Sequence, residues 1–171
     1  LQFRNRVDES TSKKQENAGP VAIEKEYGIV AVAAGKGVEE VFRDLGCDSI
    51  VSGGQTMNPS TDDILAACLA TPAKTVFVLP NNKNIVMSAE QAIPLTTERK
   101  IVVIPTKTIP QGVSAAMAFD DGQTVDEIFD SMSCAAHSVH TGQITNAVRD
   151  SEFDGQTIKM GQILALNENK I

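Results

Sequence analysis

The sequence lacks long hydrophobic runs, an excess of basic residues and a hydrophobic leader. No stretch approaches the roughly 20 apolar residues that a membrane-spanning helix requires, so none is predicted. The polar start "LQFRNRVDES" does not resemble a signal peptide. Acidic residues outnumber basic ones, 22 against 15, for a formal net charge of −7. This balance argues against a nucleic-acid partner, because phosphate binding depends on clustered lysine and arginine.

Paired cysteines are also absent. Cys47, Cys68 and Cys134 are odd in number, far apart and without a Cys-x-x-Cys spacing. We therefore expect a reducing, cytoplasmic location, with the three thiols buried as small hydrophobic groups.

The first 26 residues differ in composition from the rest of the chain. The stretch "DESTSKKQENAGP" is too polar to compensate for the entropy of ordering it, and the sequence starts with leucine rather than methionine. We predict that 1–26 is a linker or a remnant of an upstream domain. Residues 27–171 are long enough for one well-buried domain belonging to a longer protein.

From Tyr27 onward, apolar strand patterns alternate with helical ones. Continuous apolar runs such as "YGIVAVAAG" are typical of strands buried on both faces. The following segment, 36–46, ends at a glycine and places four apolar residues on one helical stripe: Val38, Val41, Phe42 and Leu45. Four such units predict an α/β fold with a mostly parallel sheet and right-handed crossovers. The strands are expected at 27–35, 47–53, 74–80 and 99–105, and the helices at 36–46, 59–70, 84–93 and 110–119.

After residue 120 the pattern changes. Segment 124–139 predicts a longer helix, whose apolar stripe contains Val125, Ile128, Phe129, Met132 and Ala136. "GQITNAVRD" and "QTIKMGQILALNENKI" are typical of strands, and "EFDGQT" carries an Asp-Gly turn signal. We expect either an antiparallel extension of the sheet or a small β appendage.

Polar loops follow all four predicted parallel strands. Ligands of open α/β sheets bind beyond the carboxyl ends of the strands, where these loops meet. Three of the loops carry a lysine, Lys36, Lys83 and Lys107, which predicts a locally positive rim in an acidic protein. Each loop alone is explained by turn and capping needs, whereas the four together favour a functional edge.

The second loop, "VSGGQTMNPS", is predicted to turn the chain and start a helix. Its glycines suit a turn, Pro59 suits the first helical position, and Asn58 or Ser60 suits the N-cap. Its spacing matches neither G-x-G-x-x-G nor the Walker A pattern. Asp62 and Asp63, in the first helical turn, disfavour a phosphate there.

Catalytic and metal-binding patterns are not recognisable in the sequence. His137 and His140 lie three residues apart without a cysteine or carboxylate at ligand spacing, so we interpret them as surface or capping residues. No nucleophile, base and metal cluster assembles into a hydrolase or phosphatase site. We therefore assign no catalytic residue and no metal site.

Four motifs resemble one protein family: "SGGQTMNPST", "LPNNKNIVMSAEQA", "VIPTKTIPQG" and "GQITNAVRDS". In order and content they are similar to the C-terminal domain of the fatty acid kinase A subunit, found in YloV-type proteins that carry a dihydroxyacetone-kinase-like domain. The resemblance covers about Tyr27 to Ile171 and implies a DegV-like fold.

The resemblance implies one part of a two-component kinase. In such proteins an N-terminal helical domain binds ATP and magnesium, and a middle domain is associated with homodimer formation. The whole phosphorylates the carboxylate of a fatty acid held by a separate DegV-type carrier, for phospholipid synthesis. The C-terminal domain is thought to dock that carrier, so this chain alone is expected to lack kinase activity and bound cofactors.

Our site prediction follows from loop position and not from the family. The residues expected to contact a partner or ligand are Gln55, Thr56, Asn58, Asn81, Asn82, Lys107 and Gln111. The alternative to carrier docking is a small-molecule site at the same edge, for an acyl chain or a phosphorylated metabolite.

Overall fold

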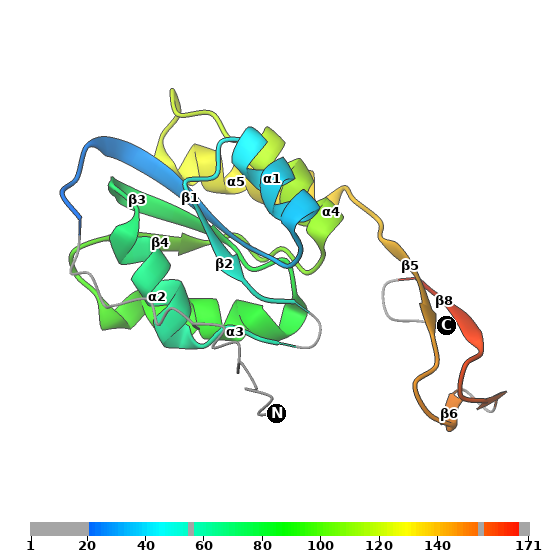
Figure 1. Cartoon of the computed structure of the whole chain (residues 1–171). Helices are drawn as coiled ribbons and strands as arrows, with labels where there is room; N and C mark the ends of the chain where they lie inside the picture. The colour runs from blue at the N-terminus through cyan, green and yellow to red at the C-terminus, as the bar shows by residue number, and fades with distance from the viewer. Residues whose placement is uncertain (1–20, 55–56, 154–155, 168–171) are drawn as a thin grey trace, which may run out of the picture.

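The α/β body of the molecule is built on a four-stranded parallel sheet. The computed structural model describes residues 21–54, 57–153 and 156–167. The strand order is β2-β1-β3-β4, so the first strand lies in the interior of the sheet (Figure 1). The strands are β1 (Lys25–Ala33), β2 (Ser49–Ser52), β3 (Ala73–Leu79) and β4 (Lys100–Val103). The parallel α/β prediction is confirmed.

Helices cover both faces of this sheet. One face carries α1 (Lys36–Asp44), α4 (Ile109–Met117) and α5 (Val125–His137), which lie together in Figure 1. The opposite face carries α2 (Thr61–Ala70) and α3 (Lys83–Ala92), which runs into the short 3-10 helix η1 (Ile93–Leu95). Burial on two faces explains why the central strands are continuously apolar and not alternating.

Each face has its own hydrophobic core. Alternate residues of β1 point to opposite sides, so Ile29 and Ala31 pack with Phe42 of α1 while Val30 and Val32 pack towards α2 and α3. The first core also contains Phe77, whose ring contacts those of Tyr27 and Phe119 with centroids 6.0 Å away in each case. Ile64 and Cys68 of α2 fill the second core.

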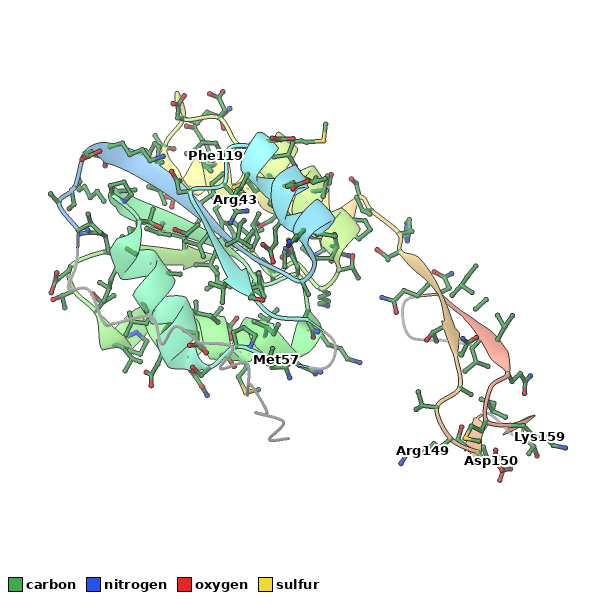
Figure 2. The ribbon with its side chains drawn as sticks, viewed as in Figure 1. Arg43, Met57, Phe119, Arg149, Asp150 and Lys159 are labelled. Atoms are coloured by element: carbon green, nitrogen blue, oxygen red, sulfur yellow. The ribbon has the colours of Figure 1, made fainter. Side chains whose placement is uncertain are left out.

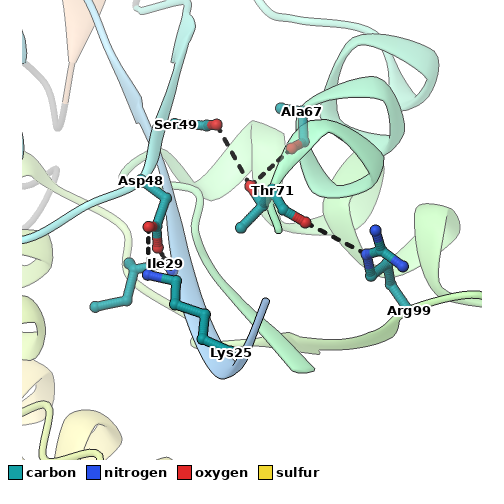
Figure 3. Close-up of polar contacts among 7 residues, drawn as sticks. All are labelled: Lys25, Ile29, Asp48, Ser49, Ala67, Thr71 and Arg99. Carbon is teal, nitrogen blue, oxygen red and sulfur yellow. Dashed lines mark hydrogen bonds and ion pairs between the residues drawn. The ribbon is translucent and has the colours of Figure 1, made fainter. Parts of the chain in front are cut away.

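The amino ends of the strands are fastened by a buried arginine and an aspartate (Figure 3). Arg99 is 5% exposed and donates hydrogen bonds to three carbonyls, those of Thr71, Glu98 and Val21. Nearby, Asp48 accepts from the backbone N–H of Ile29 at 2.8 Å and forms an ion pair with Lys25. Arg99 thus holds the chain at Val21, just before it enters β1.

The C-terminal strands form a separate arm and do not extend the sheet. β5 (Gly142–Asn146) pairs antiparallel with β8 (Ile163–Asn167), and β6 (Ser151–Phe153) pairs with β7 (Gln156–Ile158). The arm projects from the body (Figure 1), and Figure 2 shows Arg149, Asp150 and Lys159 near its far end. Of our two expectations the appendage is therefore confirmed. The expected Asp154-Gly155 turn lies outside the described residues.

Four sequence predictions fail in detail. Val41 and Phe129 were placed on buried helical stripes but are 44% and 36% exposed, because each lies at the edge of its stripe. Cys134 is exposed, unlike Cys47 and Cys68. Pro59 precedes the N-cap of α2, because Ser60 takes the cap position and the helix begins at Thr61.

We predict a pH-dependent contribution from the start of α2. The hydroxyl of Ser60 accepts from the backbone N–H of Asp63 and donates to its carboxylate, and the Ser60 N–H donates to the same carboxylate. These bonds lower the pKa of Asp63. A lowered pKa stabilises the fold above the unfolded-state pKa of about 4, and this stabilisation disappears as the pH falls through the folded-state value.

Ser60→Ala should therefore reduce the free energy of unfolding by about 1 kcal/mol at pH 7 and by less at pH 3. Urea unfolding at the two pH values measures this difference, and Ser60→Thr, which keeps a hydroxyl, is the matched control. An equal loss at both pH values would contradict the assignment.

Candidate functional site

A cavity of about 350 Å³ opens at the carboxyl end of the sheet. It lies where β1 and β3 end and where α3 and α4 begin. The adjacent strands β1 and β3 lead to helices on opposite faces of the sheet, β1 to α1 and β3 to α3, so the cavity lies at the topological switch point at which α/β sheets bind ligands. The lining residues are Val32, Ala34, Gly53, Gly54, Pro80, Asn81, Asn82, Lys83, Asn84, Ile85, Lys107, Thr108, Ile109 and Gln143.

Asn81 braces the floor of this cavity. Its φ of 57° is left-handed, a conformation that asparagine tolerates better than most residues, and its side chain is buried. The side-chain amide donates to the carbonyl of Val32 at 2.9 Å, which ties the loop after β3 to the end of β1. The hydroxyl of Thr106 donates to the Asn81 Oδ1 at 2.9 Å and accepts from the Asn81 N–H at 3.0 Å.

Gly112 on α4 is closely approached by the side chain of Asn81. A Cβ atom at this position would lie 1.9 Å from the Oδ1 of Asn81 and 2.6 Å from its Cγ, inside any permitted contact distance. The glycine in the middle of α4 is therefore explained by the close approach of Asn81, although glycine weakens a helix. Val32, Asn81, Thr106 and Gly112, which we call the Asn81 brace, join β1, the β3 loop, the β4 loop and α4.

The predicted site residues have different positions in the structure. Asn82 and Lys107 line the cavity, and the Asn82 side chain also caps α3 by accepting from the Asn84 N–H at 2.9 Å. Asn81 lines it too, but both polar groups of its side chain are used inside the brace. Gln111 accepts from the Lys107 N–H at 2.8 Å and donates to the carbonyl of Val139, so it positions the loop before α4.

The second loop contributes its two glycines to the lining of the cavity. Gly53 and Gly54 line the cavity, whereas Asn58 is exposed and not among the lining residues. Gln55 and Thr56 lie outside the described residues. Figure 2 shows Met57 at the surface of this loop, and it is 68% exposed.

The site prediction did not include several polar lining residues, among them Lys83, Thr108 and Gln143. Lys83 and Thr108 belong to the polar loops that were predicted after the third and fourth strands. The available signals were the predicted positive rim, which contains Lys83, and the helix-capping position, which Thr108 occupies. Gln143 belongs to β5, and no sequence signal placed the arm beside the cavity. At the base of the arm, the Thr141 hydroxyl contacts that of Thr108 at 2.8 Å.

The remaining candidates for chemistry have structural explanations. Burial raises the pKa of the Cys47 thiol to about 12, with Asp48 adding to it, and burial alone raises the pKa of Cys68 to about 12. Both thiols are therefore protonated and poor nucleophiles at neutral pH. The Nδ1 of His137 contacts the carbonyl of Ser133 on its own helix at 2.7 Å.

The described residues offer neither a metal centre nor a membrane span. Within residues 21–54, 57–153 and 156–167, no group of three or more His, Cys, Asp or Glu side chains is placed to hold a metal ion. In the same part of the chain, no helix combines the length and hydrophobicity needed to cross a bilayer.

Comparison with known proteins decides the family. A family model for the C-terminal region of fatty acid kinase A-like subunits matches residues 28–171. The chain belongs to this family. It is also 44% identical over 155 residues to Protein YloV of Bacillus subtilis (strain 168), covering 91% of this chain. Uncharacterised proteins of Staphylococcus aureus strains USA300 and NCTC 8325 are 41% identical over 169 residues, 99% of the chain.

The family match covers both the α/β body and the arm, so the two parts belong to one family region. The chain spans less than a third of each of these relatives, 28% of the Bacillus protein and 31% of the Staphylococcus proteins. Family membership therefore indicates a domain of a fatty acid kinase subunit.

We predict that Gly112→Ala disrupts the Asn81 brace. The added methyl group must displace Asn81 or α4, so the free energy of unfolding should fall by roughly 1–3 kcal/mol. Gly37→Ala in α1 is the matched control, because a Cβ there meets nothing within 4 Å. It should be neutral or stabilising by up to about 1 kcal/mol. Equal stabilities of the two variants in urea unfolding would refute the brace.

Proposed function

We propose that this chain is the docking domain of a fatty acid kinase and binds a DegV-type fatty-acid-binding carrier. Docking would bring the carboxylate of the bound fatty acid to an ATP- and magnesium-binding domain elsewhere in the longer protein. Two findings support the proposal: the family is that of a kinase subunit, and the chain spans less than a third of its relatives.

The exposed apolar surface of the arm is the observation that carries this proposal. Ile144 and Val148 are 81% and 87% exposed, and Met160 and Ile163 are 71% and 70% exposed. Because Ile144 pairs with Ala165 and Asn146 pairs with Ile163, Ile144 and Ile163 lie diagonally on one face of the ribbon. Clustered exposed aliphatic side chains are typical of protein-binding surfaces.

The two-stranded construction of the arm also supports docking of a partner. β5 and β8 form a sheet of two strands, and within the described residues each has an edge without a strand partner. A two-stranded ribbon is only marginally stable in water unless another element packs on it. A carrier that covers the Ile144–Ile163 face would supply that packing.

The arm is also continuous with the loop edge. Gln143, one residue before Ile144, lines the cavity beside Lys107. The arm residue that begins the Ile144–Ile163 face is therefore adjacent in the chain to one that lines the cavity. We propose that the docking surface comprises the Ile144–Ile163 face and the exposed loop residues next to it.

The arm variant Ile144→Ser with Ile163→Ser tests the docking surface. Calorimetry with the DegV-type carriers encoded in the same genome should show binding by the unaltered chain and an affinity at least about tenfold lower for the double variant. Met117→Ser is the matched control, because Met117 is 71% exposed but lies on α4 of the body. Unchanged affinity of the arm variant would reject this surface, and no binding of any carrier by the folded chain would reject the function.

The loop edge is tested separately by Lys107→Met and Asn82→Ser. Serine also caps helices, so Asn82→Ser removes the amide while keeping α3 capped. Each variant should weaken carrier binding several-fold in the same calorimetric assay, because a charged or amide contact at the rim is lost. If both bind as tightly as the unaltered chain, the loop edge is not part of the interface, whatever the arm does.

A further inference from the structure

We propose that the cavity at the switch point binds a small anionic ligand through a carboxylate or phosphate group. This site goes beyond carrier docking, since it needs no partner protein. Its volume of about 350 Å³ lies in the range of small-molecule sites, and its position at the carboxyl ends of β1 and β3 is where such sites occur.

The charge of the lining selects the ligand class. Lys83 and Lys107 are present among the lining residues, and aspartate and glutamate are absent from them. The chain as a whole has 22 acidic and 15 basic residues. The cavity therefore has the opposite sign to the average surface, and a positive cleft in an acidic protein concentrates anions.

The neutral polar groups around the cavity suit the same ligand. Asn82, Asn84 and Gln143 supply side-chain amides that can donate hydrogen bonds to anionic oxygens. The two lysines stand at the starts of different helices, Lys83 in α3 and Lys107 just before α4, so the positive helix ends add to their charge. The lysines and amides would hold the charged group from several elements at once.

The site is also preformed. The Asn81 brace fixes the loop that carries Asn82 and Lys83 against the end of β1, and it fixes the loop that carries Lys107 through Thr106. Gln111 further holds the backbone of Lys107. Little ordering of the loops is then required on binding, which favours affinity for a small ligand.

The apolar part of the lining limits the rest of the ligand. Val32, Pro80, Ile85 and Ile109 give the cavity an apolar side. Further into the sheet, Val30 of β1 and Val78 of β3 are fully buried in the hydrophobic core. The cavity therefore does not continue between the strands there. A compact ligand with a short apolar portion fits this space better than a long acyl chain.

The test is a titration of the ¹⁵N-labelled chain, without any carrier, with inorganic phosphate and with hexanoate. Each titration is matched in ionic strength against sodium chloride. We expect saturable shifts of the Lys83, Asn84 and Thr108 backbone amides with at least one probe. Saturation by phosphate alone identifies a phosphate ligand, and saturation by hexanoate alone identifies a carboxylate. Linear shifts with both probes would overturn the proposal.

Lys107→Met should lower the affinity for the probe that saturates by about tenfold, because a charge-assisted hydrogen bond is lost. Lys100→Met is the matched control: Lys100 is an exposed lysine at the opposite end of β4 and should leave the affinity unchanged. Equal weakening by both variants would show only a general charge effect and would also overturn the proposal. Because no carrier is present, this result is independent of the docking experiments.

Discussion

The shape of the loop edge depends on the hydrogen bonds of one buried amide. Asn81 connects the carbonyl that ends β1 to the hydroxyl of Thr106 beyond β4, and Gly112 leaves the room for it. Parallel strands are joined by backbone hydrogen bonds only along their length. The loops that follow them need other contacts to keep fixed positions relative to one another. Here the Asn81 side chain provides such contacts, because it holds the loops after β3 and β4 to each other and to the end of β1.

Much of the body was predictable because its strands are buried on both faces. A continuous apolar run followed by a polar loop and an amphipathic helix has few other interpretations, so all four βα units were found to within a few residues. Cys134 was expected to be buried from its residue type alone, whereas the failures at Val41 and Phe129 have a common cause. A helical stripe predicts which side of a helix faces the sheet, but not how much of that side the neighbouring helices cover.

The site was less predictable because it depends on contacts between distant positions. Loop position was enough to place Asn82 and Lys107 at one edge of the sheet. It could not show that the side chain of Asn81 is directed inward, since this depends on a left-handed backbone and on a glycine 31 residues further along. Nor could it bring Gln143 to the cavity, because contacts between distant positions, such as that between the hydroxyls of Thr108 and Thr141 at the base of the arm, leave no periodic pattern in the sequence.

Arg99 fixes the point at which the chain enters the α/β body. Arg99 binds the carbonyl of Val21 at the amino ends of the strands, whereas the cavity and the base of the arm lie at their carboxyl ends. β1, with nine residues, separates the two ends by about 30 Å. The chain therefore enters the α/β body at the end of the sheet that lies away from the loop edge, and any segment ahead of residue 21 starts from that end.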